Sequence, residues 1–426
     1  MVDTSSGDTD VHRFELAARY LLIPVFAALI GWGTNVVALR MTFYPLEYIG
    51  FGEKYFRKYG VGPWHLGWQG IVPSKAAKMA RISITLLTHE LIDVQDVFSR
   101  IDPEQVAVEL EPVMHRILSS IVGQVAHAYA PDVWASLPTY VRDEIVGRVR
   151  EDTPALIAAV MADIRANIAQ VIDLEEMVVT HLVQDKELLN SVFMRAGEKE
   201  LRFIERSGIY FGFALGLVQA LVFAIWHSWA VLPVAGFLSG YVTNWIALKL
   251  IFEPVQPTLC CFGSFELQGL FLRHQPEVSE AFGSAVAHEI MSSEQLLRQL
   301  FLSPTSDKAI QIVHYHIGGA IDRYSLALGP FLPLALGGEQ YEEMKRKVVE
   351  LYVSELPTQI KAMAPYFTAA LQLERTLVDG LKALPPSDFE AVLHPVFKED
   401  EWLLILVGGL LGCAVGVFQV LVVFRS

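Results

Sequence analysis

The chain has 426 residues, of which 53% are hydrophobic and 19% are charged, and its mean hydropathy is +0.38. This composition is more apolar than that of an ordinary soluble domain and indicates a membrane protein with sizeable polar parts. The formal net charge of -14 argues against a nucleic-acid partner, because nucleic-acid binding usually requires a basic face. The three cysteines provide neither a disulfide framework nor the paired spacing of a zinc site or a thioredoxin-like motif.

Four stretches are apolar and long enough to cross a bilayer as helices, which takes about 20 residues. They cover residues 20–39, 208–226, 231–248 and 402–424, and residues 1–19 precede them as an N-terminal tail. Two long polar segments, residues 43–205 and 253–400, show the 3.6-residue period of amphipathic helices and no sustained strand alternation. We therefore predict an all-α integral membrane protein with four transmembrane helices and two large helical extramembrane inserts.

The second half of the chain repeats motifs of the first half. The phrase "GWGTNVVALRMTFYP" at residues 31–45 recurs as "GYVTNWIALKLIFEP" at residues 240–254, an offset of 209 residues. Further along, Gln69-Gly70 recurs as Gln268-Gly269, and the two glycine-rich closing helices agree at an offset of 200 residues. Agreement of this density is the signature of an internal duplication.

The duplication predicts two tandem repeats, residues 20–227 and 230–426. Each repeat contains one transmembrane helix, one helical insert and a second transmembrane helix. Because two crossings per repeat give both copies the same orientation, we expect a pseudo-two-fold axis along the membrane normal.

Polar residues and glycines recur inside the apolar stretches. A carboxamide in hydrocarbon needs a partner on a neighbouring helix, and glycine lets a second helix approach closely. The candidates are Thr34, Asn35, Thr243, Asn244, Gly208, Gly212, Gly216, Gln219, Gly408, Gly412, Gly416 and Gln419, with the two glutamines expected near mid-membrane. One interpretation is that these residues pack the helices around the pseudo-two-fold axis. The other is that the amides line a path for a solute or a lipid headgroup.

Basic residues follow the first helix of each repeat. Arg40 and Lys249 are expected at the headgroups, where they anchor the helix end by snorkelling or contact anionic lipids. Lys54, Arg57 and Lys58 add positive charge on the same side, whereas few basic residues lie on the side of the termini. By the positive-inside rule, this asymmetry predicts cytoplasmic inserts.

The sequence contains no recognised enzyme motif, neither a P-loop, a GxSxG elbow, an HExxH pair nor a dinucleotide fingerprint. The pairs His89-Glu90 and His288-Glu289 recur, but neither has a second histidine four residues from the first. We interpret them as helix contacts, and we predict no catalytic, cofactor-binding or metal-binding residue.

Three motifs together carry a family resemblance: "GWGTNVVALRMTFYP", "GWQGIVPSKAAKMA" and "GEKELRFIERSGIYFGFALGLVQ". They resemble the bacterial multi-pass membrane family known as domain-of-unknown-function family 445. The resemblance covers both repeats, although the second copy has Leu272 where the first has the Pro73 of the family's turn. It implies an inner-membrane protein with helical cytoplasmic domains, and it implies no specific activity.

These features predict a non-enzymatic membrane scaffold or membrane-organising protein with the lipid bilayer as its partner. The alternative is lipid or small-solute handling. Four helices alone make a thin pathway, so that alternative requires a homo-oligomer.

Overall fold

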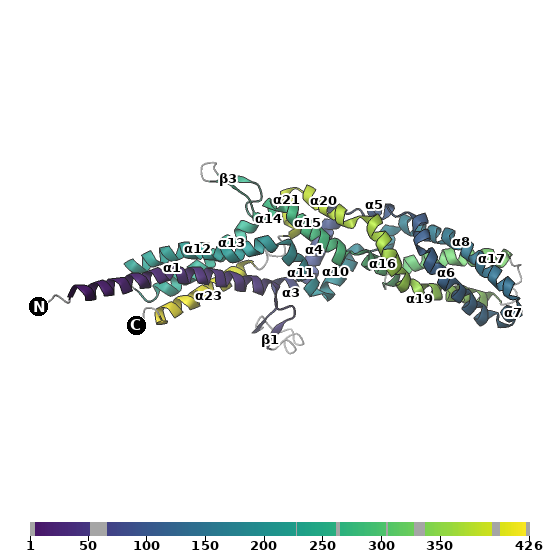
Figure 1. Ribbon diagram of the computed structural model, residues 1–426, viewed down its shortest axis with the longest axis horizontal. Coiled ribbons are helices and arrows are strands. Elements are labelled where there is room, and N and C mark those ends of the chain that lie inside the picture. Colours follow the sequence, from purple (N-terminus) through teal and green to yellow (C-terminus); the bar gives the residue numbers. More distant parts are fainter. Residues whose placement is uncertain are drawn as a thin grey trace. The chain divides into compact units, whose positions relative to one another are not determined.

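The computed structural model describes residues 5–51, 66–226, 228–260, 265–303, 306–327, 337–393 and 401–422 (Figure 1). The chain forms two compact units. The first unit comprises Met1–Ser83, Val179–Phe282 and Val378–Ser426, and the second comprises Ile84–Val178 and Gly283–Leu377. Each unit therefore combines segments from both halves of the sequence.

Four long apolar helices dominate the first unit. They are α1 (Ser5–Phe43), α12 (Glu198–Ile225), α13 (Val231–Phe252) and α23 (Glu401–Val422). Helix α1 packs lengthwise against α12, and α13 packs lengthwise against α23. The two pairs meet through α12 with α13 and through α1 with α13 and α23. Each helix contains a segment long and apolar enough to cross a membrane, namely Tyr20–Phe43, Glu198–Ile225, Val231–Phe252 and Glu401–Leu421. The prediction of an all-α protein with four such helices is confirmed.

The helices extend beyond the apolar stretches found in the sequence. Helix α1 begins at Ser5, inside the predicted tail, and α12 begins at Glu198 rather than at residue 208. Polar side chains do not interrupt the backbone hydrogen bonds between residues four apart, so hydropathy marks only the apolar part of a helix. Residues 423–424 of the last predicted stretch lie outside the described residues.

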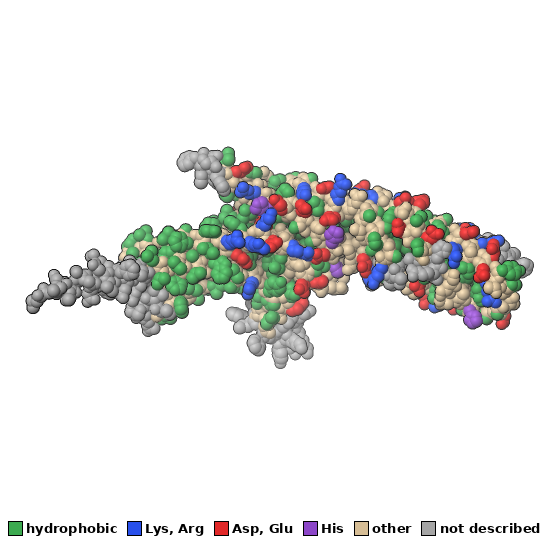
Figure 2. Space-filling view, in the orientation of Figure 1, with side chains coloured by type: hydrophobic (Ala, Val, Ile, Leu, Met, Phe, Trp, Pro, Cys, Tyr) green, Lys and Arg blue, Asp and Glu red, His purple; other side chains and the backbone are tan. Residues whose placement is uncertain are grey.

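The outward faces of these four helices are apolar. Large exposed hydrophobic side chains occur on all of them, among them Leu21, Leu29, Trp32, Phe213, Leu221, Val234, Leu238, Leu410 and Phe418. Figure 2 shows hydrophobic side chains covering most of the visible face of this helix group, whereas charged side chains gather over other elements. Soluble monomers rarely expose a contiguous apolar surface of this kind.

A short antiparallel β-hairpin follows the first helix of each pair. β1 (Ile49–Phe51) pairs with β2 (Leu66–Trp68), and β3 (Thr258–Cys260) pairs with β4 (Phe265–Leu267). The sequence analysis missed these strands, because three residues are too few to show a two-residue alternation.

The repeated Gln-Gly pair fastens the first hairpin to the end of α1. Gln69 Nε2 donates to Leu46 O at 2.7 Å, and Gly70 N donates to Pro45 O at 2.9 Å. A Cβ added to Gly70 would lie 2.7 Å from the carbonyl carbon of Phe43. Glycine is therefore required where the chain returns to the helix.

The second hairpin is held in the same way. Gln268 Nε2 donates to Val255 O at 3.3 Å, and Gly269 N donates to Pro254 O at 3.0 Å. A Cβ added to Gly269 would lie 2.6 Å from the carbonyl carbon of Phe252. The two Gln-Gly pairs thus perform the same local task.

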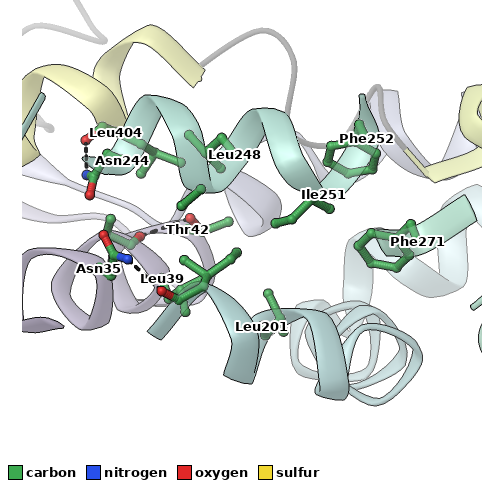
Figure 3. A pocket seen from close by; sticks show the side chains of 13 residues that line it. Asn35, Leu39, Thr42, Leu201, Asn244, Leu248, Ile251, Phe252, Phe271 and Leu404 are labelled. Carbon is green, nitrogen blue, oxygen red and sulfur yellow. Dashed lines mark hydrogen bonds between the residues drawn. The ribbon is translucent and has the colours of Figure 1, made fainter. Parts of the chain in front are cut away.

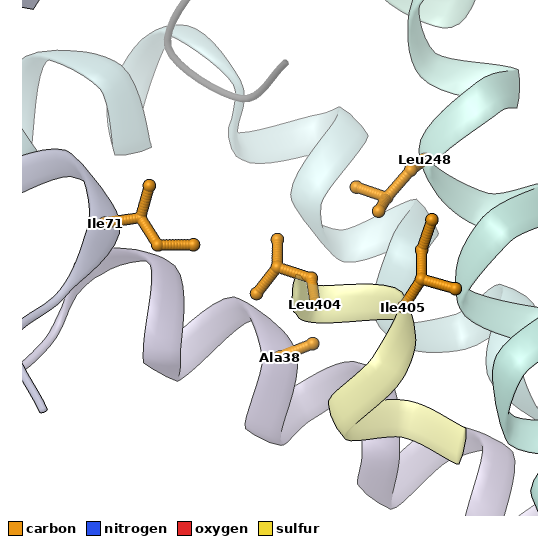
Figure 4. Close-up of a cluster of buried hydrophobic side chains, with 5 residues drawn as sticks. All are labelled: Ala38, Ile71, Leu248, Leu404 and Ile405. Atoms are coloured by element: carbon orange, nitrogen blue, oxygen red, sulfur yellow. The ribbon is translucent and has the colours of Figure 1, made fainter. Parts of the chain in front are cut away.

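Shorter helices complete the first unit. They are α3 (Ile71–Ser74), α11 (Lys186–Ala196), α14 (Leu270–Arg273) and α21 (Pro386–Leu393), with parts of α4 (Ala76–Glu90), α10 (Leu174–Gln184), α15 (Gln275–Ala285) and α20 (Leu373–Ala383). A buried cluster draws side chains from α1, α3, α13 and α23: Ala38, Ile71, Leu248, Leu404 and Ile405 (Figure 4). Because it contains side chains from both helix pairs, this cluster joins the pairs by hydrophobic burial.

The second unit is a bundle of amphipathic helices. Helix α6 (Pro103–Tyr129) packs against α8 (Thr139–Ala166) and α19 (Gly338–Leu371), and α17 (Asp307–Ala327) also packs against α8 and α19. Shorter elements are α5 (Val94–Ser99), α7 (Pro131–Ser136), α9 (Ile168–Val171), the π-helical turn η1 (Val286–Ile290) and α16 (Ser293–Leu302). A buried cluster of Ile121, Val125, Tyr341 and Met344 joins α6 to α19.

Candidate functional site

Glycines bring α1 and α12 into backbone contact. Gly208, Gly212 and Gly216 lie on the buried face of α12. A Cβ added to Gly208 would overlap the carbonyl oxygen of Gly31, and a Cβ added to Gly212 would overlap that of Ala27. Small residues permit this close packing between apolar helices.

The pair α13 and α23 repeats this arrangement. Gly408 and Gly412 contact the backbones of Gly240 and Gly236, and Gly416 is buried against the first turn of α13. We call each set of three glycines a glycine ladder: Gly208, Gly212 and Gly216 on α12, and Gly408, Gly412 and Gly416 on α23. Each ladder therefore lies inside one helix pair. The sequence analysis offered packing around the pseudo-two-fold axis as one interpretation, whereas these glycines contact the other helix of their own pair, whose small residues face them.

Asn35 and Asn244 each bond to the second helix of their own pair. Asn35 Nδ2 donates to Ile204 O at 2.5 Å, and Asn244 Nδ2 donates to Leu404 O at 2.9 Å (Figure 3). The two side chains are only 1% and 3% exposed. A Cβ added to Gly408 would overlap Asn244 Nδ2, so this glycine leaves the space that the carboxamide occupies.

Thr34 and Thr243 bond within their own helices. Thr34 Oγ1 donates to Gly31 O at 3.1 Å, and Thr243 Oγ1 donates to Ser239 O at 2.7 Å. Both threonines are buried. Because carbonyls of the same helix satisfy both hydroxyls, neither threonine requires a partner on a second helix.

Gln219 and Gln419 are both buried, at 5% and 1% exposed. Gln419 lies on α23, three residues before Val422, the last residue that the structure describes. Neither polar atom of its carboxamide has a hydrogen-bond partner among the described residues. Within the described part of the chain, Gln419 therefore contributes burial but no hydrogen bond, which is unfavourable for a buried amide.

Asn35 and Asn244 line one pocket, which contains about 460 Å³ of space outside the atoms (Figure 3). Apart from these two amides and Thr42, the lining is apolar: Ala38, Leu39, Leu201, Ile204, Ala247, Leu248, Ile251, Phe252, Phe271 and Leu404. The interior leaves room for about one water-sized molecule. A lipid headgroup does not fit there.

Arg40 and Lys249 have different surroundings. Arg40 is exposed, and within the described part of the chain it forms no ion pair. Lys249 Nζ lies 2.7 Å from Glu253 Oε2 and 5.6 Å from the ring centroid of Trp245. The residue equivalent to Glu253 in the first half is Tyr44, so only Lys249 has a neutralising acid one turn away. Other basic residues considered above, Lys54, Arg57 and Lys58, lie outside the described residues.

Two histidine–glutamate pairs occur elsewhere, one in each unit. His274 Nδ1 lies 2.8 Å from Oε1 of Glu200, which is 2% exposed. His288 Nε2 lies 3.1 Å from Glu374 Oε2. Hydrogen bonds from Ser284 and from His288 lower the pKa of Glu374 below its ordinary value. Each pair joins helices far apart in the sequence, which agrees with the helix-contact interpretation of His288.

The sequence analysis missed a third buried asparagine, Asn190. Its Nδ2 donates to Phe43 O at 2.5 Å and so satisfies a carbonyl left free at the end of α1. Its neighbours on α11, Leu189 and Phe193, are also buried. An asparagine on the apolar stripe of a helix was visible in the sequence, but its partner lies 147 positions away.

Comparison of the chain with protein-family models, with curated proteins and with solved structures gave no match. Among the described residues, no group of three or more His, Cys, Asp or Glu side chains is placed to hold a metal ion. The side chains of His89 and Glu90 are outside that description. The resemblance to family 445 and the lack of a catalytic site therefore stay predictions.

Proposed function

We propose that the chain is an integral protein of the bacterial inner membrane that acts as a non-enzymatic scaffold, with helical inserts in the cytoplasm. The observation that carries this proposal is the group formed by α1, α12, α13 and α23. Its outward faces are apolar, and its interior is packed by backbone contact between glycines.

Burial in lipid accounts for the exposed apolar surface. Leaving such surface in water costs about 25 cal/mol per Å², and hydrocarbon removes that cost. Helices suit this environment because they satisfy their backbone hydrogen bonds internally. Leu21, Phe213, Leu238 and Leu410, one on each helix, would then contact acyl chains.

Matched contacts support two tandem repeats, residues 20–227 and 230–426. Asn35 bonds to Ile204 in one pair, and Asn244 bonds to Leu404 in the other, at the offsets of 209 and 200 residues seen in the sequence. The glycine contacts and the Gln-Gly hairpin contacts are matched in the same way. Duplication of one ancestral helix–insert–helix unit explains all three correspondences.

The distribution of basic residues supports cytoplasmic inserts, and the three repeated motifs support the resemblance to family 445. Arg40 is exposed at the end of α1 that leads into the first insert, where it can contact an anionic lipid headgroup. The excess of basic residues on the insert side favours cytoplasmic inserts. The resemblance to family 445 agrees with both features.

The narrow pocket favours a scaffold over a transporter. It holds about one water-sized molecule, so this pocket offers no route for a larger solute. Lipid or solute handling by a homo-oligomer is the second candidate. It is favoured by the two buried carboxamides, Asn35 and Asn244, which line the same pocket.

Reconstitution separates these two functions. The purified full chain is placed in liposomes, and exchange of a fluorescent lipid between leaflets and release of a small neutral solute are measured. A scaffold gives the rates of protein-free liposomes. Rates above that baseline that are abolished by Asn35→Leu or Asn244→Leu at equal protein content would replace the scaffold with a pathway.

A further inference from the structure

A groove lies beside the end of α1 and the chain that leaves it. Its lining includes Val37, Arg40, Met41, Tyr44, Leu46 and Glu47, and it contains about 970 Å³ of space outside the atoms, part of which is open to the surroundings. The side chains of Val37 and Tyr44 are exposed. Because Val37, Arg40 and Met41 belong to the segment Tyr20–Phe43, which is apolar enough to cross a membrane, the groove continues the exposed apolar surface of α1.

Polar contacts hold the wall of the groove that follows α1. Gln69 Nε2 donates to Leu46 O at 2.7 Å, and Lys186 Nζ on α11 lies 2.9 Å from Glu47 Oε1. The groove is therefore formed by the fold itself. A preformed site lowers the conformational cost of binding a ligand.

The charges of the groove leave one cation uncompensated. Glu47 is paired with Lys186, so these two charges offset one another. Arg40 is exposed and forms no ion pair within the described part of the chain. The groove and its ion pair together therefore carry a net charge of about +1 from the guanidinium of Arg40.

Arg40 is also not used to cap α1. A basic side chain near the end of a helix often bonds to the last carbonyls. In α1 other donors occupy three of these carbonyls: Tyr44 N, Trp68 Nε1 and Asn190 Nδ2 donate to the carbonyl oxygens of residues 40, 41 and 43. The guanidinium is therefore available to an anion from outside the chain.

The matching position in the second half of the chain is different. Lys249 Nζ lies 2.7 Å from Glu253 Oε2, and the carboxylate of Glu401 also acts electrostatically on Lys249. At the offsets of 209 and 200 residues, the first half has Tyr44 and Leu201 in place of these two glutamates. An uncompensated cation therefore occurs in the first half and not at the matching position.

The lining favours a lipid over a free anion. A guanidinium can bind phosphate oxygens through two parallel hydrogen bonds. Val37, Met41 and Leu46 add an apolar surface beside it. A free phosphate would use the guanidinium and leave this surface in water, whereas a phospholipid carries a phosphate and apolar chains in one molecule.

We infer that the groove binds one anionic phospholipid, whose phosphate contacts Arg40 and whose acyl chain lies against Val37 and Met41. This inference rests on the proposed function, because it requires α1 to cross the membrane. A lipid of net negative charge is preferred to a zwitterionic one. The cationic group of a zwitterionic headgroup has no partner here, since the carboxylate of Glu47 is already paired with Lys186.

Native mass spectrometry of the purified full chain counts bound lipids and gives the affinity of each. One phosphatidylglycerol should bind more tightly than those that follow, and phosphatidylcholine should show no such first site. Arg40→Gln should weaken the first phosphatidylglycerol by about fivefold, which is the usual effect of one basic residue at an anionic membrane surface. Arg40→Lys should weaken it less, because the charge remains. Equal first affinities of the unmodified chain and Arg40→Gln would overturn the inference.

Lys249→Gln is the matched control from the second half of the chain, and it should leave the first affinity unchanged. A loss equal to that of Arg40→Gln would show that any basic residue at a helix end suffices, and would overturn the assignment to this groove.

Tyr44→Glu and Tyr44→Gln test the charge at fixed size. The glutamate would stand four residues from Arg40, as Glu253 stands from Lys249, and should weaken the first phosphatidylglycerol about as much as Arg40→Gln does. Tyr44→Gln should keep more of the affinity. Equal affinities of the two Tyr44 variants would contradict a site selected by charge.

Two further measurements separate the remaining outcomes. Excess inorganic phosphate should not displace the first phosphatidylglycerol, and displacement would identify a site for a free anion instead. Alkaline carbonate extraction of cell membranes tests the membrane placement on its own. Release of the chain would refute the proposed function, whereas a chain that stays in the membrane but binds lipid independently of Arg40 refutes only the inference.

Discussion

The substitution Gly212→Ala tests the contact between α1 and α12. The added Cβ would overlap the carbonyl oxygen of Ala27 and lie 3.1 Å from both the carbonyl carbon of Ala27 and Cα of Ala28. These are backbone atoms, so no side-chain rotation relieves the clash. Restoring ordinary carbon contacts of roughly 3.5–4 Å requires the helices to separate by on the order of 1 Å.

The magnitude follows from two opposing effects. Overpacking a tight interface costs about 1–3 kcal/mol. Replacing glycine by alanine inside a helix returns up to about 1 kcal/mol of helix propensity. From the middle of the first range, about 2 kcal/mol, and a gain of up to about 1 kcal/mol, we expect Gly212→Ala to lower the free energy of unfolding by about 1–2 kcal/mol.

Gly33→Ala is the control on α1, because a Cβ added there has no atom within 4 Å among those described. It should leave stability unchanged or raise it slightly, since only the propensity gain remains. Gly409→Ala should cause an intermediate loss of stability. Its added Cβ would lie 2.9 Å from the ring of Phe237, and this ring can rotate away.

The assay is equilibrium unfolding of the full chain in bicelles, followed by circular dichroism, with all three variants measured side by side. The expected order of stability places Gly33→Ala at or above the unmodified chain, Gly409→Ala below it, and Gly212→Ala lowest. Equal stability of Gly212→Ala and Gly33→Ala would refute the backbone contact. Such a result would mean that the close contact of Gly212 with α1 does not contribute to stability.

Three further predictions concern other regions. In a chain whose native cysteines are replaced by serine, Tyr140→Cys should react with a membrane-impermeant thiol reagent only after intact cells are permeabilised. The side chain of Tyr140 is 74% exposed, so labelling without permeabilisation would reverse the proposed orientation. Hydrogen bonds from Ser284 and His288 lower the pKa of Glu374 below its ordinary value of 4.5. The stability that these bonds give to the folded chain is therefore present above pH 4.5 and lost as the pH falls through the lower folded-state pKa. Glu374→Gln should therefore reduce the melting temperature more at neutral pH than at an acidic pH below the folded-state pKa of Glu374, where that carboxyl is protonated and, like glutamine, uncharged; an equal reduction at both pH values would contradict this. Gln419→Leu replaces a buried amide without partners among the described residues by a side chain of similar size, so the melting temperature should be unchanged or higher, and a clear decrease would reveal a polar contact.

Some features of this protein follow from the sequence alone, because they depend on neighbouring residues. Hydropathy over about 20 residues located the four apolar helices, and the 3.6-residue period indicated the amphipathic ones. Asparagine in an apolar stretch implied a hydrogen bond to another helix, and Asn35 and Asn244 both make one. The limits were the helix ends, since polar turns continue a helix without an apolar signal, and the three-residue strands.

The partners of these residues were decided only by the tertiary structure. Asn35 bonds to a carbonyl 169 positions away, and any of the three other apolar helices offered equivalent carbonyls. The glycine ladders could have packed between pairs as well as within them, because a flat face fits any partner with small residues opposite. Asn35 and Asn244 line one pocket only because α1 and α13 lie together while each Nδ2 is held by the second helix of its own pair. A sequence specifies which side chains need partners; which partners they meet depends on how long helices pack, and that is a property of the whole fold.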